Sequence, residues 1–177
     1  VVTQIGSTNY QTTGTVTVEI PGNVTVANDV VVAGTKTLSI GGAATVQGAI
    51  HGDSSGTNDD SLTLLAGGAV LLSGAVTPRG LKDLFIESTG GTLTLEQGVE
   101  VAGKLEVKAI GHNVTLKGFV KAPAGFSSRG AAFDLKGTSR ITTTSGAILI
   151  DHTGAVTLMS TLTAGTGTVT VNSGTAQ

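Results

Sequence analysis

Four side chains that offer oxygen ligands lie close together in the segment HGDSSGTNDDS, residues 51–61. They are Asp53, Asn58, Asp59 and Asp60. Ca²⁺ is bound by carboxylate, amide and carbonyl oxygens, so the segment is a weak candidate for a Ca²⁺ site. Its spacing matches neither an EF-hand loop nor the GGxGxD repeat of calcium-binding β-rolls, and Asp, Asn, Gly and Ser also favour turns. We expect a solvated loop, which is also the best candidate for a partner contact.

The histidines offer little chemistry. His51, His112 and His152 are predicted on different repeats, and the chain has no Cys, so we expect neither a metal site nor a cofactor. The Asp151–His152 dipeptide could form an acid–base dyad, with His152 placed at a corner. No nucleophile is predicted beside it, and Asp151 is better explained by an ion pair with Arg129. We predict no catalytic residues and a protein that is not an enzyme.

Two sequons occur, Asn23-Val24-Thr25 and Asn113-Val114-Thr115. Both asparagines fall just before an apolar pair, at equivalent places in the pattern described below. They are candidates for glycosylation. The alternative interpretation is an asparagine that turns the chain at a corner.

Charged residues of opposite sign recur along the chain with one fixed offset. The pairs that share this offset are Glu87 and Lys108, Glu96 and Lys117, and Glu100 and Lys121. Arg129 and Asp151 are separated by one residue more and extend the first series. Stacked opposite charges attract and like charges repel, so these residues would hold successive repeats in register. Exposed pairs contribute about 0–1 kcal/mol each, and we expect a structural role for them.

The elements that carry these charges are short apolar triplets with strand periodicity. The first apolar pair of each unit recurs at steps of about 21 to 24 residues. The step from Leu105 to Ile148 is about twice as long, and Phe126, which begins a unit with an incomplete pair, divides it into two. The pairs are Val16/Val18, Leu38/Ile40, Leu62/Leu64, Leu84/Ile86, Leu105/Val107, Ile148/Ile150 and Val169/Val171. Repetition at a steady period of this length is typical of a solenoid.

A second pair and a third apolar position complete each unit. The second pairs are Val24/Val26, Ala44/Val46, Val70/Leu72, Leu93/Leu95, Val114/Leu116, Phe133/Leu135 and Val156/Leu158. The third positions are Val30, Ile50, Val76, Val99, Val120 and Leu162, with Ile141 arriving two residues late. Gly48, Gly74 and Gly118 lie two residues before a third position, where we expect positive-φ corners.

Three short strands and three corners in each unit predict an all-β, right-handed, single-stranded parallel β-helix. We expect about 7–8 coils of about 21–24 residues, with the loop insertion 51–61 lengthening one coil to about 24 residues. Residues 1–177 would form a single segment. Because neither end carries a recognisable cap, we expect an internal stretch of a longer rod.

The outward positions of the first two strands bear on enzymatic function. On the first strand they are Thr17, Ser39, Thr63, Phe85, Glu106, Ser127, Leu149 and Thr170, and on the second Thr25, Thr45, Leu71, Thr94, Thr115, Asp134 and Thr157. Glycoside hydrolysis needs a pair of carboxylates on one face, and the second column, a threonine ladder with one acid, offers neither an acid pair nor an aromatic platform for a sugar. A flat threonine array could bind ice, but Leu71 and Asp134 interrupt this one.

Units such as GGTLTLEQGVEVAGKLEVKA and TGAVTLMSTLTAGTGTVTV resemble the repeats of filamentous-haemagglutinin-type adhesins. The resemblance runs from Gly14 to Thr175. These proteins are large right-handed β-helices, and many are exported by two-partner secretion. The resemblance implies a secreted protein of the bacterial cell surface, with a host receptor or glycan and its own flanking coils as partners.

Composition excludes some other functions. A net charge of -2 argues against nucleic acid as a partner. The sequence contains no run of about 18 apolar residues, so no membrane span is predicted. We expect a non-catalytic structural or adhesive segment that acts as a rigid stalk. The alternative is a carbohydrate-binding or carbohydrate-active β-helix module.

Overall fold

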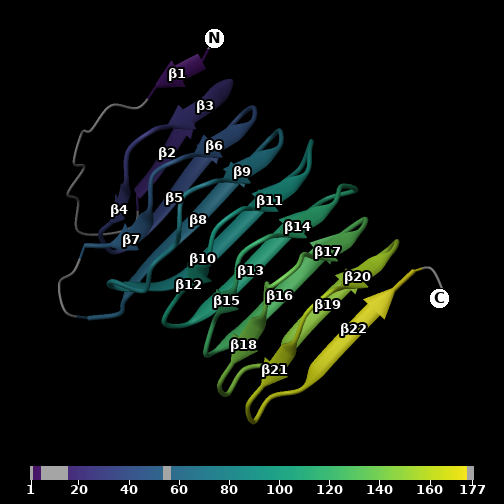
Figure 1. Cartoon of the computed structure of the whole chain (residues 1–177). Helices are drawn as coiled ribbons and strands as arrows, with labels where there is room; N and C mark the ends of the chain where they lie inside the picture. The colour runs from purple at the N-terminus through teal and green to yellow at the C-terminus, as the bar shows by residue number, and fades with distance from the viewer. Residues whose placement is uncertain (1, 5–15, 54–56, 175–177) are drawn as a thin grey trace.

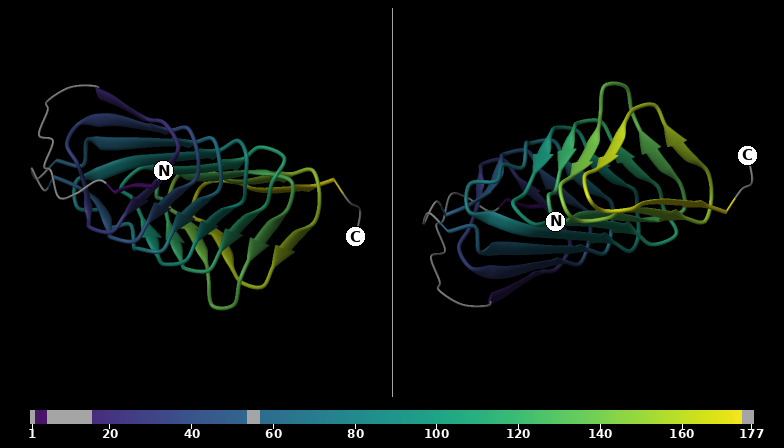
Figure 2. Two further views of the ribbon diagram at one scale, coloured as in Figure 1. Left: turned by 90° about the horizontal axis from the view of Figure 1, so that it is seen from above. Right: turned by 90° about the horizontal axis from the view of Figure 1, so that it is seen from below.

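The computed structural model describes residues 2–4, 16–53 and 57–174, and over these residues the chain is built from parallel β-strands without a helix. The strands form flat ribbons that lie side by side along a rod, with the N-terminal and C-terminal coils at opposite ends (Figure 1). Seen along other directions, successive coils follow one behind the next around a common interior (Figure 2). The fold is therefore a parallel β-helix, as the sequence predicts.

Two faces of the rod are sheets of eight strands each. The first-strand sheet contains β2 (Val16–Ile20), β5 (Thr35–Ile40), β8 (Asp60–Ala66), β10 (Leu81–Ser88), β13 (Lys104–Ala109), β16 (Gly125–Gly130), β19 (Ile148–His152) and β22 (Val169–Ser173). The second-strand sheet contains β1 (Val2–Gln4), β3 (Asn23–Val26), β6 (Ala44–Val46), β9 (Val70–Leu72), β11 (Leu93–Leu95), β14 (Val114–Leu116), β17 (Phe133–Leu135) and β20 (Val156–Leu158).

The third face is made of shorter strands. It consists of β4 (Val30–Val32) and β7 (Ile50–Gly52), followed by β12 (Val99–Glu100), β15 (Val120–Lys121), β18 (Ile141–Thr143) and β21 (Leu162–Ala164). Single parallel bridges from Ile50 to Val76 and from Val76 to Val99 connect the two groups. Each coil thus contributes one strand or bridge to each of three faces, which confirms the predicted three-strand coil.

From β10 onward the first-strand register agrees with the sequence pattern. Leu84 pairs with Leu105, Leu105 with Phe126, and Phe126 with Ile148. The degenerate start at Phe126 is therefore a true repeat position. Ile141, which arrives late in the pattern, still pairs with Val120.

The position predicted for the second coil is wrong by two residues. Val16 pairs with Lys36 and Lys36 with Leu62, so the pair in register with Val16/Val18 and Leu62/Leu64 is Lys36/Leu38 instead of Leu38/Ile40. The first coil is therefore two residues shorter than predicted, and the coil with the insertion is two residues longer. The cause is β8, where every second residue from Asp60 to Ala66 is buried. A slip of two residues keeps the same side chains inward, so the apolar pattern alone cannot detect it.

The glycines before the third strands serve a different purpose from the one expected. Gly48, Gly74 and Gly118 do not have positive φ; that conformation occurs at other glycines, such as Gly22 (φ 91) and Gly137 (φ 53). A Cβ added to Gly74 would lie 1.9 Å from the carbonyl oxygen of Gly48 in the preceding coil. These positions need glycine because two backbones approach closely, and not because the chain turns with positive φ.

The interior is a continuous core of stacked aliphatic side chains, among them Val70, Leu93, Leu95 and Leu116. Several residues predicted to point inward are less buried near the two ends of the rod. Val156 is only partly buried, and the exposed ones are Leu158, Val18, Val169 and Val171. They lie on β20, β2 and β22, which are end strands of their sheets. Their side chains have a neighbouring coil on one side only, which explains the lost burial.

The alternation of side chains on β11 predicts a sharp difference between two adjacent substitutions. Leu95→Asp places a charge in the core and should cost several kcal/mol of unfolding free energy. Thr94→Asp puts the same group on the outward side of the same strand and should change the free energy by about 0.5 kcal/mol or less. Urea denaturation of both variants measures the difference. Equal losses of stability would contradict the inward assignment.

The two kinds of glycine should respond differently to asparagine. Asn tolerates positive φ, so Gly137→Asn, where an added Cβ has no neighbour within 4 Å, should cost about 1 kcal/mol or less. Gly74→Asn forces a side chain against the Gly48 backbone and should cost about 1–3 kcal/mol. Thermal unfolding of the two variants tests this. A Gly74→Asn protein as stable as wild type would show that the coils are free to separate locally.

Candidate functional site

Opposite charges face each other across adjacent coils. Glu87 lies opposite Lys108 in the register of β10 and β13, and Nζ of Lys108 lies 3.0 Å from Oε2 of Glu87. Nζ of Lys117 is 2.9 Å from Oε1 of Glu96. The Nζ of Lys121 also contacts Oε1 of Glu100, which lies opposite it in β12. These are the three pairs that share one offset in the sequence. All are at least partly exposed, so each contributes about 0–1 kcal/mol and their main effect is on register.

The first of these columns continues toward the C-terminal end. Lys108 lies opposite Arg129, and Arg129 lies opposite Asp151. Nε of Arg129 is 3.7 Å from Oδ2 of Asp151, and Nδ2 of Asn172 donates to Oδ1 of Asp151 at 3.2 Å. The two neighbouring cations thus each have an acid on their far side, Glu87 and Asp151, which offsets their mutual repulsion.

The candidate Ca²⁺ ligands do not converge. Asp60 is buried, and its carboxylate accepts hydrogen bonds from the Gly34 amide at 2.5 Å and the Asp53 amide at 3.0 Å. Asp59 instead accepts from the Thr57 hydroxyl at 2.7 Å. Among the described residues, no group of three His, Asp or Glu side chains could hold a metal ion. Asp60 therefore anchors both ends of the insertion, whose residues 54–56 lie outside the described part.

At several corners an Asn or Asp side chain accepts a hydrogen bond from a backbone amide of the next coil. Oδ1 of Asn23 accepts from the amide of Ala43 at 2.8 Å, and Oδ1 of Asp29 accepts from Ala49 at the same distance. Oδ1 of Asp83 accepts from Lys104 at 2.7 Å. Asn23 and Asn113 are both exposed, so glycosylation at these two sequons stays a prediction.

The threonine column of the second-strand sheet has the predicted composition. Thr45 faces Leu71, and Asp134 lies between Thr115 and Thr157. Asp134 pairs with Lys136, two residues along the chain. In the first-strand sheet, however, Ser39 does not belong to the column of Thr17. It lies opposite Glu19 and Leu65, because of the two-residue shift described above.

His152 is the main departure from the predicted site residues. It is the last residue of β19, and its side chain is buried instead of exposed at a corner, with only 3% of its surface accessible. The reason is Gly130, its register partner, whose missing side chain leaves room for the imidazole. The His152 ring packs 5.3 Å from the ring of Phe133. Burial lowers the pKa of His152 to about 4, although the nearby Asp151 carboxylate acts in the opposite direction.

Sequence reasoning missed the partner of His152, which is Ser128. Its Oγ lies 2.9 Å from Nε2 of His152, the contact expected between a nucleophile and a general base. Ser128 is 0% exposed and belongs to the interior of β16, so substrate has no access to the pair. Nδ1 of His152 has no hydrogen-bond partner among the described residues, and Asp151 therefore does not orient the ring. The pair is a polar contact within the core.

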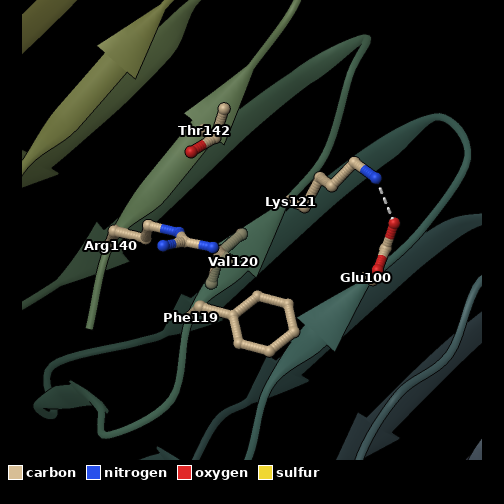
Figure 3. A pocket seen from close by; sticks show the side chains of 6 residues that line it. All are labelled: Glu100, Phe119, Val120, Lys121, Arg140 and Thr142. Atoms are coloured by element: carbon tan, nitrogen blue, oxygen red, sulfur yellow. Dashed lines mark hydrogen bonds and ion pairs between the residues drawn. The ribbon is translucent and has the colours of Figure 1, made fainter. Parts of the chain in front are cut away.

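A shallow groove on the third face was also not anticipated. It is about 380 Å³ in volume and is lined by Glu100, Phe119, Val120, Lys121, Arg140 and Thr142. Figure 3 shows the Phe119 ring between the Arg140 guanidinium and the Glu100–Lys121 pair. The predicted absence of an aromatic platform concerned the second-strand column, but the column just before the third strand contains an aromatic residue. The available signal was Phe119 itself, which lies one repeat after Gly98.

These features define the class of the protein as a parallel β-solenoid with charge-paired coils. In comparisons with known proteins no family model matches the chain, and no curated protein or solved structure matches it. No helix of sufficient length and apolar character to cross a membrane occurs in the described ranges.

The buried imidazole predicts that stability declines under mild acid. The pKa of His152 is lower in the folded state than the ordinary 6.5, so its contribution is complete above pH 6.5 and is lost as the pH falls toward about 4. We expect a lower urea midpoint at pH 5 than at pH 7. His152→Met should flatten this dependence, whereas His51→Gln, on an outward face, should leave it in place. The same slope in wild type and His152→Met would contradict the assignment.

Proposed function

We propose that this chain is a non-catalytic structural segment of an extracellular bacterial adhesin or filament, where it acts as a rigid stalk. The observation that carries the proposal is the register, which continues from coil to coil on the first-strand sheet from β2 to β22. Such a structure is rigid along its axis, because each coil contacts its neighbouring coils on three faces.

The geometry also relates sequence length to reach. Parallel strands lie about 4.8 Å apart, so each added coil extends the rod by that distance. The eight strands of the first-strand sheet correspond to roughly 35 Å. A protein with this architecture gains length simply by adding coils, which suits a spacer between a cell surface and a distant contact.

The surface chemistry is consistent with this role. The coil of β10, β11 and β12 and the coil of β13, β14 and β15 carry opposite charges, and the three ion pairs between them favour this register. The polar pair Ser128 and His152 is enclosed, so the most enzyme-like contact among the described residues cannot reach a substrate. The resemblance to filamentous-haemagglutinin-type repeats supports a secreted, surface-exposed location, with a host receptor or glycan and flanking coils of the parent chain as partners.

A tag in the insertion loop tests the extracellular location. Thr57, Asn58 and Asp59 are exposed, so a short epitope inserted after Asn58 should leave the coils intact. We expect an antibody to label intact cells of the organism that produces the tagged protein. The control is the same epitope on a protein known to be intracellular in that organism, which should be labelled only after lysis. Labelling of the stalk only after lysis would contradict the proposal.

A further inference from the structure

The groove on the third face is built by a column of residues that immediately precede the third strands. Backbone hydrogen bonds link successive members: the Val76 amide donates to Gly98 O at 3.0 Å, Val99 to Phe119 O at 2.8 Å, and Val120 to Arg140 O at 2.7 Å. Gly98, Phe119 and Arg140 are therefore stacked on three successive coils. The residues before them in this column are small, namely Ala49 and Ala75.

Gly98 determines how the Phe119 ring lies. A Cβ on Gly98 would be 2.3 Å from Cε1 of Phe119, so the ring occupies the space that the absent side chain leaves. One side of the ring thus rests on the preceding coil, and the residue remains 42% exposed. In Figure 3 the ring is seen nearly face-on, so its outer face is presented to the groove. An open aromatic face supported from below is a platform on which a flat apolar surface can stack.

Arg140 gives this platform a charge. Its Cζ lies 6.0 Å from the centroid of the Phe119 ring, and in the described part of the chain it forms no ion pair. The other cation of the groove, Lys121, is already paired with Glu100. A ligand anion would therefore meet Arg140, whose planar guanidinium suits a carboxylate in a bidentate contact.

The remaining lining offers hydrogen bonds. Lys121 and Glu100 provide a donor and an acceptor, and the Thr142 hydroxyl lies opposite Lys121 in the register of β15 and β18. A ligand that fits must present one apolar face to the ring, hydroxyl groups to these side chains and a carboxylate to Arg140. A sugar ring has apolar C–H faces and peripheral hydroxyls, and a uronic acid adds the carboxylate.

We propose that the Phe119–Arg140 groove binds a uronic acid residue of an acidic glycan. Phe119 stacks on the sugar ring, Arg140 binds its carboxylate, and Glu100, Lys121 and Thr142 contact its hydroxyls. The groove is open and shallow, so binding of a single residue is weak, and useful attachment requires many grooves on one surface. This site is independent of the stalk function, which needs no ligand.

Titration with trigalacturonic acid, followed by NMR chemical shifts, tests the proposal. We expect saturable shifts at Phe119 and its neighbours, and a methyl-esterified trisaccharide should bind about tenfold more weakly. Arg140→Gln should reduce affinity for the acid about tenfold and leave affinity for the ester unchanged. The matched control is Arg129→Gln, which removes an exposed arginine from the first-strand sheet and should have no effect.

A second pair of variants separates binding from folding. Phe119→Ala should abolish binding of both the acid and the ester, and Phe119→Leu, which keeps apolar volume without a ring, should do the same in a protein with wild-type thermal stability. The proposal is overturned if no probe binds, if acid and ester bind equally, or if Arg140→Gln and Phe119→Leu bind normally. Binding of hexaglutamate as tight as that of the trisaccharide would also overturn it, in favour of an acidic peptide. None of these results bears on the stalk.

Discussion

Backbone hydrogen bonds between parallel strands of adjacent coils are the constraint on which the rest of the structure depends. They hold equivalent positions of successive coils about 4.8 Å apart, so every residue in one coil has a residue at the equivalent position of the next coil as its neighbour. Where the backbones come closest, only glycine fits, as at Gly74 above Gly48. Where side chains point outward, opposite charges on adjacent coils attract each other, as in Glu96 and Lys117. Where they point inward, volume must be shared, as in Gly130 and His152.

The same constraint explains how much could be predicted from the sequence. A steady period and alternating apolar triplets were enough for the fold, and the shared charge offset was enough for the ion pairs from β10 onward. The register of the second coil could not be predicted, because β8 buries alternate residues over its whole length and a two-residue slip leaves the pattern unchanged. In the structure Leu38 faces Leu64, and the insertion adds more residues than the spacing of apolar pairs indicated.

The site residues were harder to predict because their roles depend on neighbours in adjacent coils. The sequence suggests that His152 lies at a corner, but in the structure Gly130 leaves space for its imidazole inside the rod. The sequence suggests that Asp60 is a solvent-exposed ligand, but in the structure it is buried and accepts a hydrogen bond from the Gly34 amide. Phe119 follows the same logic at the surface, since Gly98 decides that its ring lies flat. In all three cases the role of the residue depends on a residue in the adjacent coil. That partner is distant in the sequence and can be found only when the exact number of residues per coil is known.

The pairing of unlike residues across coils also bears on how such an array can lengthen during evolution. An identical copy of one coil, inserted next to the original, would place Lys117 beside a second lysine and Phe119 beside a second phenylalanine. Both the charge pairing and the fit over glycine would be lost at the new junction. A tandem duplication of two neighbouring coils would preserve the alternation of Glu96 with Lys117 and of Gly98 with Phe119 at each step. Lengthening by pairs of such coils would therefore keep these contacts, whereas lengthening by single coils would not.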